Sequence, residues 1–150
     1  MSEGCVFCDQ SWMRECEIFI ETPHCTFAAM TRDPGIRAQA KLAEGVLPGC
    51  GAIVPIAHRT SVFELTPAEW ADTRDLLLQA QMALHDRLAP DGYLLGWNQG
   101  AGLHPHLHVI PRFDDEPLSD RGLRSAINVP ENRRPNPWAP GSGRALRPAR

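Results

Sequence analysis

Long hydrophobic runs are missing from the 150-residue sequence: none approaches the roughly 18 residues of a membrane span, which argues against an integral membrane protein. Residues 1–12, MSEGCVFCDQSW, lack the apolar core of a secretion signal, so we expect no signal peptide. An excess of positive charge is missing too, because the formal net charge is −3, and this disfavours a general nucleic-acid-binding protein. The sequence contains no internal repeat. These absences favour a soluble protein, which we expect in the cytoplasm.

Cysteines are few, and their number is odd. Five cysteines in a chain without a recognisable export signal indicate a reducing compartment, and they favour a metal site or free thiols over disulfide bonds. The length is that of one domain, and 43% hydrophobic residues are enough to bury a core.

The C-terminal segment differs from the rest of the chain in composition. Residues 128–150 contain five arginines against one glutamate, together with five prolines and almost no large aliphatic side chains. Such a segment cannot bury enough apolar surface to offset its loss of conformational entropy, so we expect an extended or disordered tail. Its charge fits a weak contact with RNA or another phosphate-rich partner, but a solvated terminus is the simpler interpretation.

The clearest element is a long helix predicted over 67–88. Thr66 and Glu69 have the spacing of a capping box, with Pro67 at the first helical position. The Pro-Asp-Gly turn at 90–92 ends the helix. Its apolar residues recur at helical spacing and are expected to form the buried face: Trp70, Leu77, Leu84 and Leu88.

Short strands are predicted on both sides of this helix, at 18–21, 25–29, 52–55, 93–97 and 106–112. A short helix at 37–44 fits inside the long connection over 31–49. Strands joined by hairpin-length turns around one long helix indicate an α+β domain. We therefore predict an antiparallel sheet of about five strands with one long and one short α-helix.

Three of the six histidines fall in HPHLHVI at 104–110. Alternate residues of a strand share a face, so His104, His106 and His108 would form a row with about 6.6 Å between neighbours. Burying three imidazoles without partners is costly, which favours a metal site or a catalytic row over a structural role. Pro105 cannot donate a hydrogen bond to the sheet, so His104 is expected at the opening of the strand.

Two glycines and an asparagine precede the histidine row. Gly100 and Gly102 would let a phosphate approach the backbone N–H groups, and Asn98 offers an amide donor for a phosphate oxygen. A glycine pair alone is more often only a turn. Beside the histidines, it favours an anion site.

Cys5 and Cys8 form a CxxC pair with no second CxxC or HxxxH nearby. Such a pair is half of a zinc site, whose other ligands must come from elsewhere in the fold. A redox dithiol is an alternative, although that motif normally opens a helix after a strand. Two unrelated core cysteines are a third possibility.

These motifs together resemble the histidine triad (HIT) superfamily of nucleotide hydrolases and transferases. HPHLHVI matches the family signature His-φ-His-φ-His-φ-φ, where φ is a hydrophobic residue. The stretches that also fit bacterial HIT-like proteins are CVFC at 5–8, PGCGAIVPIAH at 48–58, FELT at 63–66 and VIPRF at 109–113. The resemblance implies that residues 1–127 are a HIT-like nucleotide-binding domain and that the protein is a homodimer.

The resemblance also implies an enzyme that cleaves at the α-phosphorus of a purine nucleotide conjugate, either a dinucleoside polyphosphate or a nucleoside phosphoramidate. His106 would be the nucleophile and would form a nucleotidyl-histidine that water resolves. Neutral imidazole suits this role at pH 7, and a backbone carbonyl on Nδ1 would leave Nε2 free to attack. Asn98 would position the phosphate beside Gly100 and Gly102, and His108 would contact the phosphate or the leaving group.

A structural zinc ion is a further implication of the resemblance, with Cys5, Cys8, His58 and His104 as its ligands. No organic cofactor is implied. The zinc would fix the N-terminal segment to the sheet and would orient the first histidine of the row.

Two stretches depart from the family pattern. The connection from Asn98 to His104 is short and lacks the usual phosphate-contacting Gln-Ser or Gln-Thr element. The family's acidic ribose-binding residue corresponds to Thr31, at the start of the long connection. A nucleotide-binding module with little turnover, and a nucleotidyltransferase that uses phosphate or a sugar phosphate as acceptor, are therefore kept as alternatives.

Overall fold

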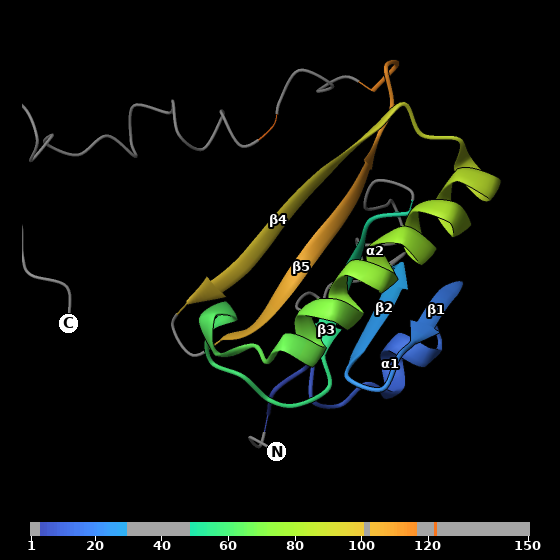
Figure 1. The fold of residues 1–150 in the computed structure, drawn as a ribbon. Helices are drawn as coiled ribbons and strands as arrows, with labels where there is room; N and C mark the ends of the chain where they lie inside the picture. Colours follow the sequence, from blue (N-terminus) through green and yellow to red (C-terminus); the bar gives the residue numbers. More distant parts are fainter. Residues whose placement is uncertain (1–3, 30–48, 101–102, 117–121, 123–150) are drawn as a thin grey trace, which may run out of the picture. The chain divides into compact units, whose positions relative to one another are not determined.

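The computed structural model describes residues 4–29, 49–100, 103–116 and 122. All the helices and strands described below lie in one compact unit that ends at Glu116 (Figure 1). Several predictions lie outside the described residues: the short helix at 37–44, the roles of Thr31 and Gly102, and the tail over 128–150.

Within the described residues, the sheet has five antiparallel strands in the order β1-β2-β3-β5-β4. The α+β class and the antiparallel sheet are thereby confirmed. β1 and β2 begin and end where the sequence predicts, whereas β3, β4 and β5 are longer than predicted. The strands are β1 (Ile18–Glu21), β2 (Cys25–Ala29), β3 (Gly51–Pro55), β4 (Gly92–Gly100) and β5 (Leu103–Arg112).

The hairpin of β4 and β5 contains an irregularity at the start of the histidine row. Asn98 pairs with His106, and Gly100 pairs with Leu103. Between these pairs β4 contributes only Gln99, while β5 contributes both His104 and Pro105. A proline has no N–H for the ladder, and such a bulge is where a strand tolerates it. His104 therefore lies near the opening of the strand, as predicted.

The helix α2 (Pro67–Leu88) has the predicted bounds. Both halves of the capping box form, since Glu69 N–H donates to Thr66 Oγ1 and Thr66 N–H donates to Glu69 Oε2. The helix ends at Ala89, which adopts a left-handed conformation with φ 45°.

The buried face of α2 agrees with the predicted one at Leu84 but not at Trp70. Leu76, Ala80 and Leu84 are fully buried against one face of the sheet, and burial of each leucine contributes about 1.5–3 kcal/mol. Trp70 is 45% exposed and instead packs edge-on against Trp97, with ring centroids 5.6 Å apart. The helical stripe is thus rotated away from the tryptophan.

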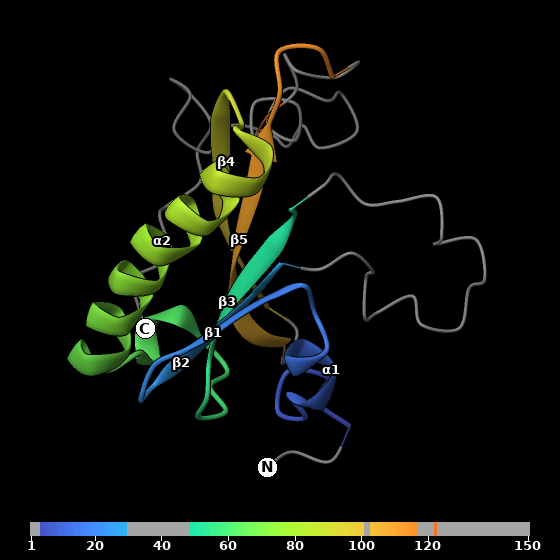
Figure 2. The same cartoon turned by 90° about the vertical axis from the view of Figure 1, so that its right-hand side faces the viewer.

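The opposite face of the sheet carries a second core cluster. Figure 2 shows α2 on one side of the sheet and α1 (Ser11–Arg14) on the other. The cluster on the α1 side consists of Phe7, Trp12, Met13, Ala28, Ala52 and Val54. The amino-acid sequence does not predict α1, because four residues are too few to show a helical period. A short 3₁₀ helix, η3 (Val62–Glu64), precedes α2.

Among the helices that the structure describes, none combines the length and the apolar character needed to cross a membrane.

Candidate functional site

The three histidines of β5 lie on one face of the sheet, as the strand alternation predicts. Leu107 and Val109 lie on the other face, in the core beneath α2. His104 and His106 are almost completely buried, whereas His108 is partly exposed. Burial of two imidazoles requires partners, and each of them has one.

The ring of His106 has a defined tautomer. Its Nδ1 lies 3.0 Å from the backbone carbonyl oxygen of His104. A carbonyl can only accept, so Nδ1 carries the proton, and in the neutral ring Nε2 keeps its lone pair. Burial lowers the pKa of His106, against the opposing effect of the His104 carbonyl, and thereby favours the neutral ring.

The ring of His108 contacts the ring of His106. Its Nε2 lies 3.2 Å from Nε2 of His106, with the two rings edge to face. Because His106 offers a lone pair there, the proton between them belongs to His108. The side chains therefore present one nucleophilic nitrogen and one N–H donor to the same point.

Phe7 packs directly on the central imidazole. The ring centroids of Phe7 and His106 are 4.4 Å apart at an interplanar angle of 36°. The edge contact of Phe7 with His104 is longer, 6.2 Å at 77°. Sequence reasoning assigned Phe7 no role, and its only signal was its place between Cys5 and Cys8.

Two residues of β4 pair with histidines of the row: Asn98, which was predicted to contact phosphate, and Gly96. Asn98 is exposed and pairs with His106, which puts both side chains on the same face. Gly100 ends the strand with φ +128°, a conformation that favours glycine. Gly96 pairs with His108 and leaves the position beside it without a side chain. Gly96 was not predicted, because its place depends on the strand register.

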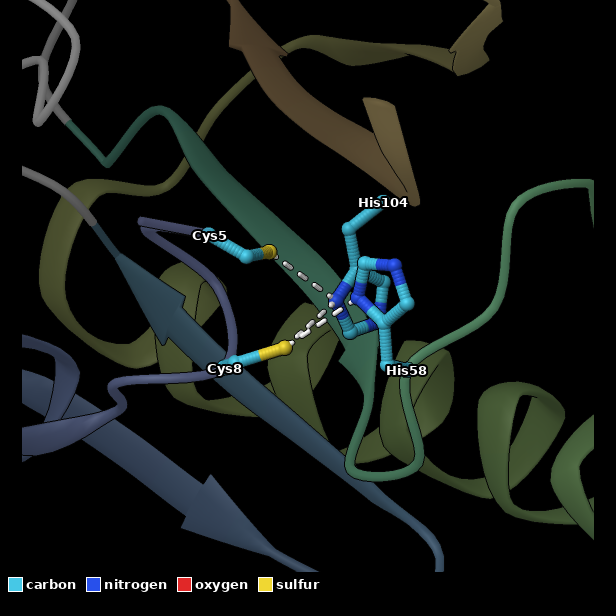
Figure 3. Close-up of side chains that lie close together, drawn as sticks. All are labelled: Cys5, Cys8, His58 and His104. Atoms are coloured by element: carbon cyan, nitrogen blue, oxygen red, sulfur yellow. Dashed lines mark hydrogen bonds between the residues drawn. The ribbon is translucent and has the colours of Figure 1, made fainter. Parts of the chain in front are cut away.

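Figure 3 shows a cluster of four side chains that come from three parts of the chain: Cys5, Cys8, His58 and His104. Their ligand atoms all lie within 4.8 Å of one another. Cys8 Sγ is 3.2 Å from His58 Nδ1 and 3.7 Å from His104 Nδ1, and Cys5 Sγ is 3.6 Å from His104 Nδ1. Zinc bonds of about 2.3 Å to sulfur and about 2.0–2.1 Å to nitrogen give a tetrahedral S···N edge of about 3.6 Å. The four residues therefore fit a tetrahedral zinc ion.

The protonation state of His104 also suits a metal ligand. Burial and the neighbouring His58 ring lower the pKa of His104 to about 4, although the Pro55 carbonyl and Glu69 act in the opposite direction. The ring is neutral at pH 7, as coordination requires. The five cysteines, all within the described residues, form no disulfide bond, and no described helix begins at Cys5 or Cys8, unlike the arrangement typical of a redox dithiol.

The loop that carries His58 is fixed to the start of α2. Arg59, the next residue, forms an ion pair with Glu69, with both guanidinium contacts at 3.0 Å. Burial acts to raise the pKa of Glu69, but the N–H of Thr66 and the Arg59 guanidinium outweigh it, so the pKa is lowered. The same carboxylate thus caps the helix and holds the His58 loop.

Comparison with known proteins shows that the chain is similar to solved structures but matches no protein by sequence family. No protein-family model and no curated protein matches the chain. A HIT family protein from Bacillus anthracis is 19% identical, with 85% of this chain and 93% of that chain covered and a TM-score of 0.55. A Zn-bound histidine triad family protein from Mycobacterium smegmatis is 23% identical, with 79% of this chain and 82% of that chain covered and a TM-score of 0.53.

A hypothetical histidine triad nucleotide-binding protein from Sulfolobus tokodaii is similar as well, at 21% identity, 75% and 71% coverage and a TM-score of 0.55. These likenesses show the fold. The chain has the HIT-like fold that the sequence resemblance implies.

Proposed function

We propose that the chain is a member of the HIT superfamily and hydrolyses purine nucleotide conjugates at the α-phosphorus, through a nucleotidyl-histidine intermediate on His106. The observation that carries this proposal is the orientation of the His106 ring. With Nδ1–H bonded to the His104 carbonyl, the Nε2 lone pair points toward His108. A neutral imidazole fixed in this way needs no separate base.

In the proposed reaction, His106 Nε2 forms a bond to the α-phosphorus while the bond from phosphorus to the leaving oxygen or nitrogen breaks. The His104 carbonyl stabilises the positive charge that the ring gains. Water then attacks the same phosphorus, releases the nucleoside monophosphate and restores neutral His106. Before the first step, a phosphate has to take over the hydrogen bond that His108 donates to His106, because that bond occupies the attacking lone pair.

The substrate would lie along the Asn98 side of the row. Asn98 shares the face of His106, and Gly96 leaves space beside His108. We assign phosphate contacts to Asn98, Gly100, Gly102 and His108, and a ribose contact to Thr31. The substrates are dinucleoside polyphosphates or nucleoside phosphoramidates.

We further propose that zinc is the metal of the Cys5, Cys8, His58 and His104 cluster. The donor set and the S···N distances support it. A closed set of four protein ligands makes this ion structural, so the bond-breaking steps do not involve it. The proposal includes no organic cofactor.

A homodimer in the cytoplasm completes the proposal. β4 lies at the end of the strand order and Leu95 on it is 44% exposed, so a second copy would cover apolar surface there. Five cysteines that form no disulfide bond fit a reducing compartment.

The test is product analysis with diadenosine tetraphosphate, an adenosine phosphoramidate and an adenylylated amine. Wild type should release AMP or ATP, and His106→Ala should lose turnover by at least a thousandfold while it stays folded. His85→Ala, which removes an exposed imidazole from α2, is the matched control and should retain full activity. Mass spectrometry of quenched wild type should detect AMP on the peptide that contains His106.

Equal activity of His106→Ala and wild type would refute the assignment. AMP binding without any turnover would identify a nucleotide-binding module instead. A product that gains added phosphate or sugar phosphate in place of water would identify a nucleotidyltransferase.

A further inference from the structure

We propose that Phe7 is a positioning residue that makes the orientation of His106 depend on the Cys5, Cys8, His58 and His104 cluster. The inference rests on the proposed function, because it concerns the nucleophile of that reaction. Phe7 contributes no ligand atom to the cluster and no polar atom to the site. Its role would be to restrict a ring that must point in one direction.

The His106 ring needs such restriction. The last torsion of a histidine side chain is broad, so rotamer preference alone does not set the direction of Nε2. Contacts on three sides set it here: the His104 carbonyl on Nδ1, His108 on Nε2 and Phe7 on the ring face. The first two come from β5 itself, and Phe7 comes from the N-terminal segment.

The position of Phe7 depends on the turn that carries the two cysteines. The N–H of Cys8 donates to the carbonyl of Cys5 at 3.1 Å, which closes the turn around Phe7. Phe7 also contacts Trp12, with ring centroids 6.1 Å apart, and Trp12 Nε1 donates to the Val6 carbonyl at 2.8 Å. The buried Phe7 ring therefore contacts both Trp12 and His106, and its backbone belongs to the turn.

The cluster connects this turn to the sheet. The sulfur atoms of Cys5 and Cys8 lie 3.2–3.7 Å from the Nδ1 atoms of His58 and His104, and a thiol makes only weak hydrogen bonds at such distances. A metal replaces these contacts with four bonds and holds the turn, and with it Phe7, against β5. Loss of the metal should therefore free the His106 ring, although the metal takes no part in the reaction.

This coupling predicts a specific kinetic pattern. Phe7 and the metal both act on the direction of the attacking nitrogen rather than on substrate binding. Loss of either should lower kcat about tenfold, the upper range for an aromatic pair, and should leave KM within about twofold. Loss of both should cost little more than loss of one, because they act through the same contact.

The experiment compares wild type, Phe7→Leu and the matched control Met13→Leu, a volume-conserving change in the same core cluster. Each protein is studied with zinc bound and after chelation. Zinc content, kcat, KM and the ¹⁵N signals of the His106 ring are measured. Phe7→Leu should keep one zinc and show broadened or shifted His106 signals with the lowered kcat. Met13→Leu should match wild type, and chelated wild type should resemble Phe7→Leu.

Unchanged His106 signals and an unchanged kcat in zinc-loaded Phe7→Leu would overturn the inference. So would an equal loss of kcat on chelation in wild type and in Phe7→Leu, because the metal would then act by another route. If Phe7→Leu fails to fold or to retain zinc, Phe7→Met replaces it, because the flexible methionine side chain adapts to the space that the ring leaves. The NMR signals need no substrate, so they test the inference even if the proposed function fails.

Discussion

The buried carboxylate of Glu69 should make a measurable contribution to the stability of the fold. Its side chain is 4% exposed and joins the start of α2 to the loop that carries His58. Oε2 accepts the N–H of Thr66 at 2.7 Å, and Oε1 accepts two nitrogens of Arg59 at 3.0 Å. Replacement of Glu69 by alanine removes the carboxylate half of the capping box and the support of the His58 loop together, while the bond from the backbone N–H of residue 69 to Thr66 Oγ1 can remain.

The expected loss follows from these contacts. Breaking a buried ion pair costs about 3–5 kcal/mol. The Arg59 side chain keeps 29% exposure and can be solvated, so we expect the lower value, about 3 kcal/mol, for Glu69→Ala. Glu69→Gln keeps the shape and an acceptor for Thr66 but loses the charge, and should cost about 1.5 kcal/mol.

The pH dependence has a definite sign. The pKa of Glu69 is lowered on folding, because the Thr66 N–H and Arg59 outweigh burial. The carboxylate therefore stabilises the fold fully above its unfolded pKa of about 4.3, and this contribution is lost as the pH falls through the folded pKa. The difference in unfolding free energy between wild type and Glu69→Gln should be constant from pH 8 to about pH 6 and should shrink below about pH 4.3.

Urea unfolding monitored by tryptophan fluorescence measures these differences. Excess chelator keeps all proteins metal-free, so that acid release of a metal does not contribute. Asp86→Asn, which neutralises an exposed acid on the same helix, is the control. A loss below about 0.5 kcal/mol for Glu69→Ala at pH 7, or a difference that does not shrink in acid, would refute the reasoning.

Three further changes test the site and the core. Wild type expressed without added zinc should contain about one zinc per chain by metal analysis, and Cys8→Ser should contain less than a tenth of that, whereas Cys16→Ser should match wild type. Gly51→Ala would place a Cβ 2.5 Å from the Ala28 carbonyl oxygen, so it should destabilise by more than about 2 kcal/mol in urea unfolding. Gly92→Ala meets nothing within 4 Å and should change stability far less. Leu84→Ala should cost about 2–5 kcal/mol in the same assay, and a value under 1 would contradict its burial.

The parts of the fold that the sequence predicts are those with local causes. Thr66, Pro67 and Glu69 define the start of α2 through hydrogen bonds within four residues. The common face of the histidine row follows from the period of a strand. These features need no knowledge of the rest of the molecule, and the structure contains both.

The remaining features depend on contacts between distant residues. Trp70 packs on Trp97 of β4 instead of in the core, and no pattern within the helix indicates that contact. The place of Gly96 opposite His108 depends on the register of the two strands. The stacking of Phe7 on His106 joins residues 99 positions apart in sequence, so no local pattern reveals it. The metal ligands His58 and His104 came from family resemblance, because their spacing from the CxxC pair is set only by the folded sheet.

The separation between Cys5 and His104 also bears on the order of events during synthesis. These residues are 99 positions apart, and β5 is the last strand along the described part of the chain. At about 5–20 residues per second, the ribosome completes His104 about 5–20 s after Cys5. During that interval, at most one of the two histidines of the cluster, His58, is present to contact Cys5 and Cys8. Completion of the four-residue cluster must therefore be a late step, and reduced thiols have to persist until β5 joins the sheet.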